Sequence, residues 1–286
     1  YDLNVKSFKT TKKDLENFLP PGTIPATVRI PETMNLSGSF KGLATSFSTN
    51  LLLQSNKGSA RLAGTLNSNN KTYDINGSIN NLDIGYLVKQ DTMVGKVTMS
   101  FAAKGTGFSP AAMNSKLTAD MQAAFIKGYN YENLAVTASM QNGHLDVDAG
   151  MGDKSVAFKM RAQALIDDKF ATNIKLRLLL DSILMQPLGF TSTDLRVHGN
   201  VIADIPVADM KAPQGTIQIA ELVVANDGKR YAADTITVTA AASDTGQVLT
   251  LHSQVATATL AGRYNLTTIA AGVMQVVDKY YNTGVD

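Results

Sequence analysis

The amino-acid sequence predicts an all-β protein, built as an elongated, twisted, mainly antiparallel sheet with few short helices. Three observations support this fold class: apolar and polar residues alternate along many segments, tight-turn dipeptides separate these segments, and the order of segments recurs along the chain. Successive side chains of a strand point to opposite faces of a sheet. The alternation therefore predicts one apolar and one polar face.

The composition narrows the classes of protein. The 286 residues carry a formal charge of +2, from 26 Lys and Arg against 24 Asp and Glu, which gives no basic field for nucleic acid. The absence of cysteine excludes disulfides, a thiolate nucleophile and Cys-ligated metals. No apolar run approaches the roughly 18 residues of a membrane span. The chain opens at Tyr1 inside a predicted strand, so we expect it to be part of a longer protein.

The first third of the chain is expected to contain a short helix, a hairpin and a second short helix. Helical spacing over Asp14–Leu19 ends at Pro20-Pro21, which cannot continue a helix. The polar cluster Asn67–Lys71 is predicted to join two strands as a loose hairpin loop. Apolar residues at helical spacing predict the second helix over Leu82–Leu87.

The middle of the chain has the strictest alternation. It predicts strands over residues 97–103, 117–125, 156–162 and 174–180. Between the second and third of these strands lies Asn142-Gly143, a dipeptide that readily adopts the positive φ angles of a type I′ turn. The sequence therefore predicts a tight hairpin there, with antiparallel neighbours.

The last third adds two helices and two turns. A short helix is predicted over Ser182–Leu188. Asn226–Lys229 and Thr245-Gly246 are predicted to be hairpin turns. A final helix, capped by Thr267 or its neighbour, would present an apolar stripe from Ile269 to Tyr280, most simply as a cap packed on the end of the sheet.

An imperfect internal repeat organises these elements. Thr33-Met34 followed by Leu36–Gly42 is similar to Thr92-Met93 followed by Val97–Phe101, and a third version starts at Asp194. We therefore treat residues 1–286 as one elongated segment with approximate repeat units 1–90, 91–190 and 191–286. Such repetition favours a solenoid-like sheet in which neighbouring units cover each other's edges.

Catalytic and metal-binding patterns are weak. His144, His198 and His252 lie far apart, and none has metal-ligand spacing with another histidine or a carboxylate. Asp146 and Asp148 share one strand face near His144, which allows an acid–base or cation site, although a solvated face is the simpler interpretation. No nucleophile elbow or phosphate-binding glycine loop is present. We expect a protein that is not an enzyme and has no cofactor or metal.

The strand series Ile217–Val224, Asn226–Tyr231 and Ile236–Val238, with the later segment Ala258–Leu266, resembles the TamB branch of the AsmA-like envelope proteins. This resemblance implies a β-sheet curled into a taco-like groove with an apolar interior. It also implies a protein in the periplasm of a Gram-negative bacterium, anchored in the inner membrane, that moves phospholipid toward the outer membrane. In some members of this family, an outer-membrane β-barrel partner of the TamA type takes part in assembling proteins.

The alternating apolar residues are the predicted groove lining. Burying a methylene gains about 0.8 kcal/mol, so a 16-carbon chain gains on the order of 10 kcal/mol gross from an apolar trough. The same residues could instead form an ordinary sandwich core, since antiparallel sheets usually bury one face. The predicted lining consists of Val97, Met99, Phe101, Leu117, Met121, Phe125, Val136, Met140, Val156, Phe158, Met160, Ile174, Leu176, Leu178, Leu180, Val197, Ile217, Ile219, Ile236, Val238, Leu249 and Leu251.

Two functions from different classes remain open. In the first, the segment binds phospholipid acyl chains and conducts them between the inner and outer membranes. In the second, it is an assembly scaffold whose sheet edges accept strands of outer-membrane proteins by β-augmentation, together with a barrel partner. A surface adhesin of stacked β units is a third, weaker interpretation.

Overall fold

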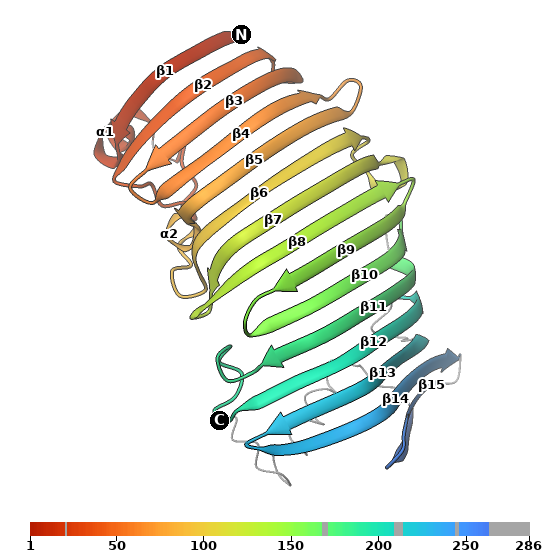
Figure 1. Ribbon diagram of the computed structural model, residues 1–286. Helices are drawn as coiled ribbons and strands as arrows, with labels where there is room; N and C mark the ends of the chain where they lie inside the picture. The colour runs from red at the N-terminus through yellow and green to blue at the C-terminus, as the bar shows by residue number, and fades with distance from the viewer. Residues whose placement is uncertain (21, 168–170, 209–213, 244–245, 263–286) are drawn as a thin grey trace. The chain divides into compact units, whose positions relative to one another are not determined.

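The computed structural model describes residues 1–20, 22–167, 171–208, 214–243 and 246–262. The predicted all-β class is confirmed. Sixteen strands follow one another in sequence order in a single antiparallel sheet, with β1 and β16 at the two ends, so the sheet is not closed. The chain divides into two compact units, residues 1–141 and 142–286. Figure 1 shows the strands of each unit side by side and curving along their length.

The first unit contains eight strands and three short helical segments. Their bounds are β1 Asp2–Thr11, α1 Lys12–Phe18, β2 Thr33–Leu43, β3 Ser46–Ser55, β4 Gly58–Asn67, β5 Thr72–Asp83, α2 Ile84–Val88, β6 Val94–Thr106, the 3₁₀ helix η1 Pro110–Ala112, β7 Asn114–Ile126 and β8 Tyr129–Gln141. Consecutive strands are joined mostly by tight turns, which keeps each strand beside its neighbour in sequence.

The second unit contains the other eight strands. Their bounds are β9 His144–Gly152, β10 Val156–Ile166, β11 Ala171–Leu184, β12 Leu195–Val207, β13 Gln214–Asn226, β14 Lys229–Ser243, β15 Gly246–Ser253 and β16 Thr257–Gly262. The division of the chain at residue 141 does not coincide with the predicted repeat boundaries at 90 and 190. The repeat itself stays a prediction.

The predicted hairpin turns have the expected backbone. Asn142 and Gly143 have φ angles of 49° and 84°, and Asp227 and Gly228 have 46° and 80°. Both central residues of each turn are therefore in the left-handed region that a type I′ turn requires. At the Asn67–Lys71 loop, the Asn67 side chain accepts hydrogen bonds from the backbone N–H groups of the second and third residues after it, both at 3.0 Å.

Two of the predicted helices are present and begin at side-chain caps. The Thr11 hydroxyl accepts the backbone N–H of Asp14 at 3.2 Å, and the Asp14 carboxylate accepts the Thr11 N–H at 3.2 Å. This capping box starts α1. The Asp83 carboxylate accepts the Tyr86 N–H at 3.0 Å and starts α2, which ends at left-handed Lys89.

The helix predicted over Ser182–Leu188 is wrong. Residues 182–184 continue β11, where Ile183 pairs with Val197 and Leu184 with Arg196, and residues 185–189 form turns. Strand pairing takes the backbone groups that the helix would need, and Pro187 has no N–H to donate to a helix. The final helix predicted after Thr267 lies outside the described residues, as does Thr245 of the predicted turn.

The described part of the protein has no deeply packed core. Its strands contact their sheet neighbours, while α1 contacts β1, α2 contacts β6 and η1 contacts β8. Only five hydrophobic residues among those described are buried, and none of the described large side chains is fully buried. These five residues are Leu82, Ala124, Tyr129, Leu188 and Ala203. No described element covers a face of the sheet as a second layer.

Replacing Gly85 in α2 by alanine is expected to destabilise the first unit. A Cβ at this position would overlap the backbone carbonyl of Val94 and lie 3.0 Å from the carbonyl oxygen of Gln90. Backbone atoms cannot move aside cheaply, so the free energy of unfolding should fall by about 2 kcal/mol or more. Urea unfolding followed by circular dichroism measures the change.

Gly152→Ala is the control for this substitution. A Cβ at Gly152 meets no atom within 4 Å, so its unfolding free energy should stay within about 0.5 kcal/mol of the parent protein. Equal unfolding midpoints for the two variants would contradict the packing of α2 against the start of β6.

Candidate functional site

The apolar face of the first unit is built from rows of residues that run across all eight strands. The strand registers place each member beside the next. One row is Val5, Gly38, Leu51, Leu62, Gly77, Phe101, Ala119 and Val136, and its neighbour is Phe8, Leu36, Leu53, Ala60, Ile79, Met99, Met121 and Leu134. Neither row contains a charged residue.

The apolar face of the second unit has the same construction. Its rows follow the registers from β9 to β16. One row is Val147, Ala162, Leu176, Ala203, Ile217, Val238, Leu251 and Ala258, and the next is Ala149, Met160, Leu178, Val201, Ile219 and Ile236. Each unit thus presents its own apolar face, again without charges in these rows.

On β6 and β8 the alanines of the two faces differ in exposure. On β6, Ala103 of the apolar face is half-buried, whereas Ala102 of the opposite face is exposed. On β8, Ala138 is half-buried and Ala135 is exposed. The difference does not extend to every strand of the unit, since Ala63 of the polar face is half-buried and Leu62 of the apolar face is 40% exposed. Figure 1 shows the strands of this unit curving along their length.

All the predicted lining residues except Phe125 lie on the apolar face of their unit. The strand registers bring together Val97, Met99, Phe101, Leu117, Met121, Val136 and Met140 in the first unit. In the second unit they bring together Val156, Phe158, Met160, Ile174, Leu176, Leu178, Leu180, Val197, Ile217, Ile219, Ile236, Val238, Leu249 and Leu251. None of them is buried, although each lies on the face that a core would occupy.

Phe125 is a correction. Met121 pairs with Met99, but Ala123 pairs with Thr98 and Ala124 with Val97, so β7 contains one extra residue near position 122. This β-bulge moves Ala124 onto the apolar face and Phe125 onto the polar face. The Phe125 ring lies over Gly95 and the side chain is 42% exposed.

Sequence reasoning missed the apolar face of β1 to β5. Phe8, Leu53, Ile75 and Ile79 belong to it, as the registers show. Glycines occupy several of its apolar positions, and at Gly77 the ring of Phe101 from the next strand lies where a side chain would be. The alternation Ile75, Gly77, Ile79 is a signal that could have identified this part.

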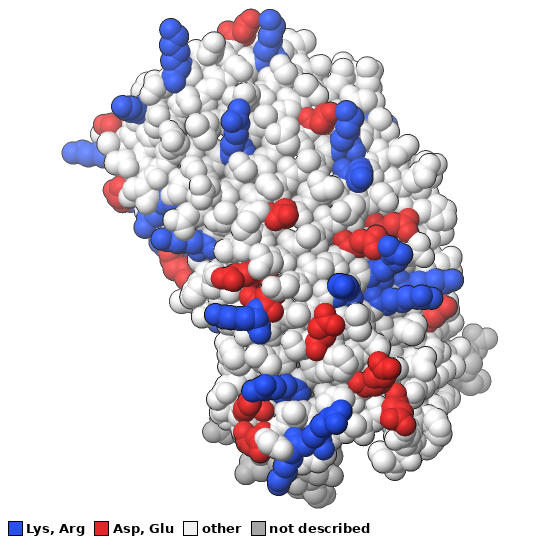
Figure 2. Space-filling model, in the orientation of Figure 1, with Lys and Arg blue, Asp and Glu red and all other residues white. Residues whose placement is uncertain are grey.

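The opposite, polar face carries exposed charges that pair locally. Figure 2 shows Lys, Arg, Asp and Glu scattered over the visible surface instead of gathered in one patch. The Nζ atom of Lys104 lies 2.7 Å from Oδ2 of Asp74, and this hydrogen bond raises the pKa of Lys104. Arg161 lies 2.7 Å from Asp148, and the Gln163 amide donates to Asp146 at 2.5 Å.

Four of the five candidate catalytic residues, Asp146, Asp148, His198 and His252, have local polar partners. On the solvated face, Asp146 accepts a hydrogen bond from Gln163 and Asp148 accepts one from Arg161, as the simpler interpretation expected. The Nδ1 atoms of His198 and His252 lie 2.9 Å from the Asp181 carbonyl and the Thr257 hydroxyl, on different strands. In the described ranges, no group of three or more His, Asp or Glu residues is placed to hold a metal ion. None of the described helices is long and apolar enough to cross a membrane.

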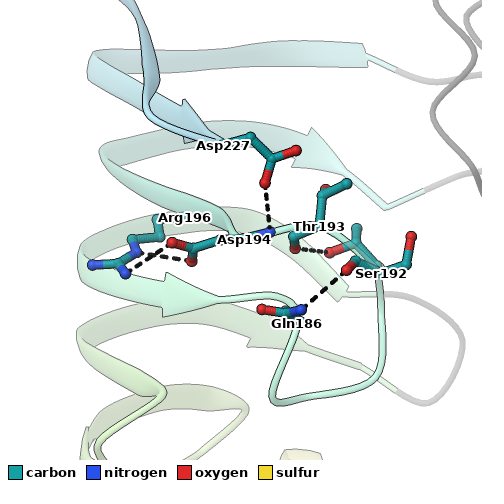
Figure 3. Close-up of polar contacts among 7 residues, drawn as sticks. Gln186, Ser192, Thr193, Asp194, Arg196 and Asp227 are labelled. Carbon is teal, nitrogen blue, oxygen red and sulfur yellow. Dashed lines mark hydrogen bonds and ion pairs between the residues drawn. The ribbon is translucent and has the colours of Figure 1, made fainter.

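A polar network holds the loop between β11 and β12. Figure 3 shows the Arg196 guanidinium against both oxygens of Asp194, at 3.0 and 2.9 Å. The Asp194 N–H donates to Asp227 of the β13–β14 turn at 3.2 Å, and the Gln186 amide donates to the Ser192 carbonyl at 3.0 Å. Leu188 of this loop is 7% exposed. These contacts fasten the loop at one end of the strands.

Arg196→Gln should raise the pKa of Asp194 toward its ordinary value of 3.8. In the parent protein, the hydrogen bond from Arg196 and then its charge keep the carboxylate ionised and lower this pKa. Because the pKa of Asp194 is lower in the folded than in the unfolded protein, the ionised carboxylate stabilises the fold at pH values above its pKa in the unfolded protein. This stabilisation is lost as the pH falls through its pKa in the folded protein. A carboxyl-carbon NMR titration measures the shift.

Arg61→Gln on the polar face of the first unit is the control and should leave the Asp194 titration unchanged. An Asp194 pKa that stays lowered in the Arg196 variant would contradict the pairing in the loop.

Comparison with known protein families, with curated proteins and with solved structures finds no match to this chain.

Proposed function

We propose that the apolar faces bind hydrocarbon chains of phospholipids, and that this chain is a non-catalytic segment of a lipid-transport path. The observation that carries the proposal is an apolar face on which all but a few of the described residues are half-buried or exposed, with no described element covering it. Apolar surface left in water has an unfavourable free energy, so a guest that covers it is stabilised.

The dimensions of a row fit such a guest. Neighbouring strands lie about 4.8 Å apart, so a row across the eight strands of the first unit extends over roughly 34 Å. An acyl chain can lie along it with one methylene after another in contact. At about 0.8 kcal/mol for each buried methylene, a 16-carbon chain gains on the order of 10 kcal/mol before ordering costs.

The chemistry of the lining suits movement as well as binding. Met99 and Met121 are directly opposite each other on β6 and β7, and Met140 and Met160 lie on the same kind of face. Methionine side chains are unbranched and adapt to irregular shapes. Aliphatic side chains form no directional bonds with a hydrocarbon, so neighbouring positions along a row have similar free energies. A bound chain can therefore shift along the face.

The cellular setting is proposed on the sequence resemblance alone. In that setting the full-length protein is anchored in the inner membrane of a Gram-negative bacterium. Its groove lies in the periplasm and carries phospholipid between the inner and outer membranes. A TamA-like β-barrel is the proposed outer-membrane partner.

Leu178→Asp tests the apolar face directly. The substitution places a carboxylate between Met160 and Val201, and a hydrocarbon chain that passes it would have to desolvate the charge at a cost of a few kcal/mol. Phospholipid that copurifies with the protein should fall by about tenfold or more. Mass spectrometry of organic extracts measures it, and the circular dichroism of the β-sheet should be retained. Combining this change with Leu176→Arg should strengthen the loss.

Leu179→Asp is the matched control. Leu179 is the adjacent residue in β11, is also leucine, and lies on the polar face with 38% exposure. Its substitution by aspartate should leave the bound lipid unchanged. Equal lipid content in the folded Leu178 and Leu179 variants would contradict binding at the apolar face.

The edge strand supports the second candidate, an assembly scaffold. Among the described strands, β1 pairs with β2 alone, and its apolar residues Leu3 and Phe8 are 57% and 50% exposed. A client strand could add to this edge by backbone hydrogen bonding and continue the apolar rows. In that function Leu178→Asp leaves activity intact, and crosslinks from client proteins concentrate on β1.

A further inference from the structure

A hollow of about 460 Å³ lies outside the apolar rows. It is bounded by α1, by the segment that follows α1 (residues 19–20 and 22–30), and by the C-terminal end of α2. Three cations line it: Lys12 from α1, Arg29 from the segment, and Lys89 from the end of α2. Ile24, Val28 and Ile30 contribute apolar walls. The volume lies in the range of small-molecule sites.

The walls of the hollow are fixed by contacts between distant parts of the first unit. The Arg29 N–H donates to the Leu87 carbonyl at 2.7 Å, and the Tyr86 hydroxyl donates to the Ile30 carbonyl at 3.2 Å. The Arg29 guanidinium lies 4.7 Å from the centre of the Tyr86 ring. It also binds both oxygens of Asp91, at 3.0 and 3.1 Å. These contacts fasten the segment to α2 and give one wall a fixed position.

The two lysines leave positive charge unpaired in the hollow. The Lys89 ammonium donates to the Ala26 carbonyl, which occupies one of its three hydrogens. Neither Lys12 nor Lys89 forms an ion pair among the described residues. Glu16 also lines the hollow, and its single negative charge does not balance two ammonium groups. The charge of Arg29 is balanced by Asp91.

We propose that this hollow binds the phosphate group of a glycerophosphate moiety. Lys12 and Lys89 supply charge-assisted hydrogen bonds to the phosphate oxygens, and the apolar wall contacts the carbon skeleton attached to it. A free sugar or a neutral lipid would leave the two ammonium groups without a partner. The phosphate site stands on the hollow itself; that the phosphate belongs to a lipid rests on the proposed function.

The first experiment uses a soluble probe. Glycerol 3-phosphate is titrated calorimetrically into the whole protein and into the Lys12→Gln/Lys89→Gln double variant. The dissociation constant should rise on the order of tenfold, because two partly exposed charged contacts are lost. Lys116→Gln/Lys159→Gln removes the same charge from the polar face and should leave the dissociation constant unchanged.

Glu16→Gln should change the dissociation constant of glycerol 3-phosphate in the opposite direction. Removing the one carboxylate of the lining should tighten glycerol 3-phosphate binding a few-fold, and raising the salt concentration should reduce this gain. A variant that merely disturbed the fold would weaken binding instead.

A second arm separates the two sources of phosphate. Vesicles of phosphatidylglycerol are compared with vesicles in which diacylglycerol replaces half of it, using the same variants. Lysine-dependent binding of glycerol 3-phosphate supports the site for free phosphate esters. Lysine-dependent binding confined to phosphatidylglycerol vesicles supports it for lipid headgroups. Absence of both, or equal loss in the Lys116/Lys159 control, overturns the phosphate site.

The outcome is distinguishable from failure of the lipid proposal. The phosphate site lies in the first unit, whereas Leu178 and Leu179 lie in the second. If the lysine substitutions do not change phosphate binding while Leu178→Asp still reduces bound lipid, only the phosphate site is rejected. If the lysine substitutions weaken phosphate binding while Leu178→Asp leaves bound lipid unchanged, only the hydrocarbon-binding face is rejected.

Discussion

Lateral backbone pairing between sequence neighbours is the constraint on which the rest of the structure depends. Within each unit, interior strands pair through backbone N–H and C=O groups with the strands before and after them, apart from local bulges, so this pairing needs no second layer. Side chains in a row then contact their counterparts on the neighbouring strands. Stability therefore comes from ladders and same-face contacts, and the apolar face can stay uncovered in the described residues without loss of the fold.

Half-burial connects this constraint with the proposed function. In the first unit, Met99 and Met121 of the apolar face are half-buried and Leu117 is 40% exposed, so the described residues shield this face only in part. A sandwich core would have buried those side chains against a second layer. The remaining exposure is the source of free energy for a hydrocarbon guest. The polar face carries local pairs such as Lys104 and Asp74, and the charges on the visible surface are scattered.

The sequence predicted what is local and missed what depends on pairing. Alternation and Asn-Gly or Asp-Gly turns specify strands, faces and hairpins within a few residues, and these predictions are confirmed. Phe125 was misplaced because alternation cannot detect the extra residue of a bulge, which exists only relative to the partner strand. The helix at residues 182–188 was wrong because β12 pairs with Ile183 and Leu184. Whether a second layer covers the apolar face is a tertiary property that no periodicity reveals.

The most direct test of the open apolar face is the rate of methionine oxidation by hydrogen peroxide, read residue by residue with and without bound lipid. Met99, Met121 and Met160 lie half-buried on the apolar faces, and Met93 is an exposed reference outside the strands. If the apolar face is open, all four methionines oxidise readily in lipid-free protein, and lipid slows the oxidation of the first three but not of Met93. Slow oxidation of the first three in lipid-free protein, unchanged by lipid, would show that the chain covers its own apolar face and would contradict the account.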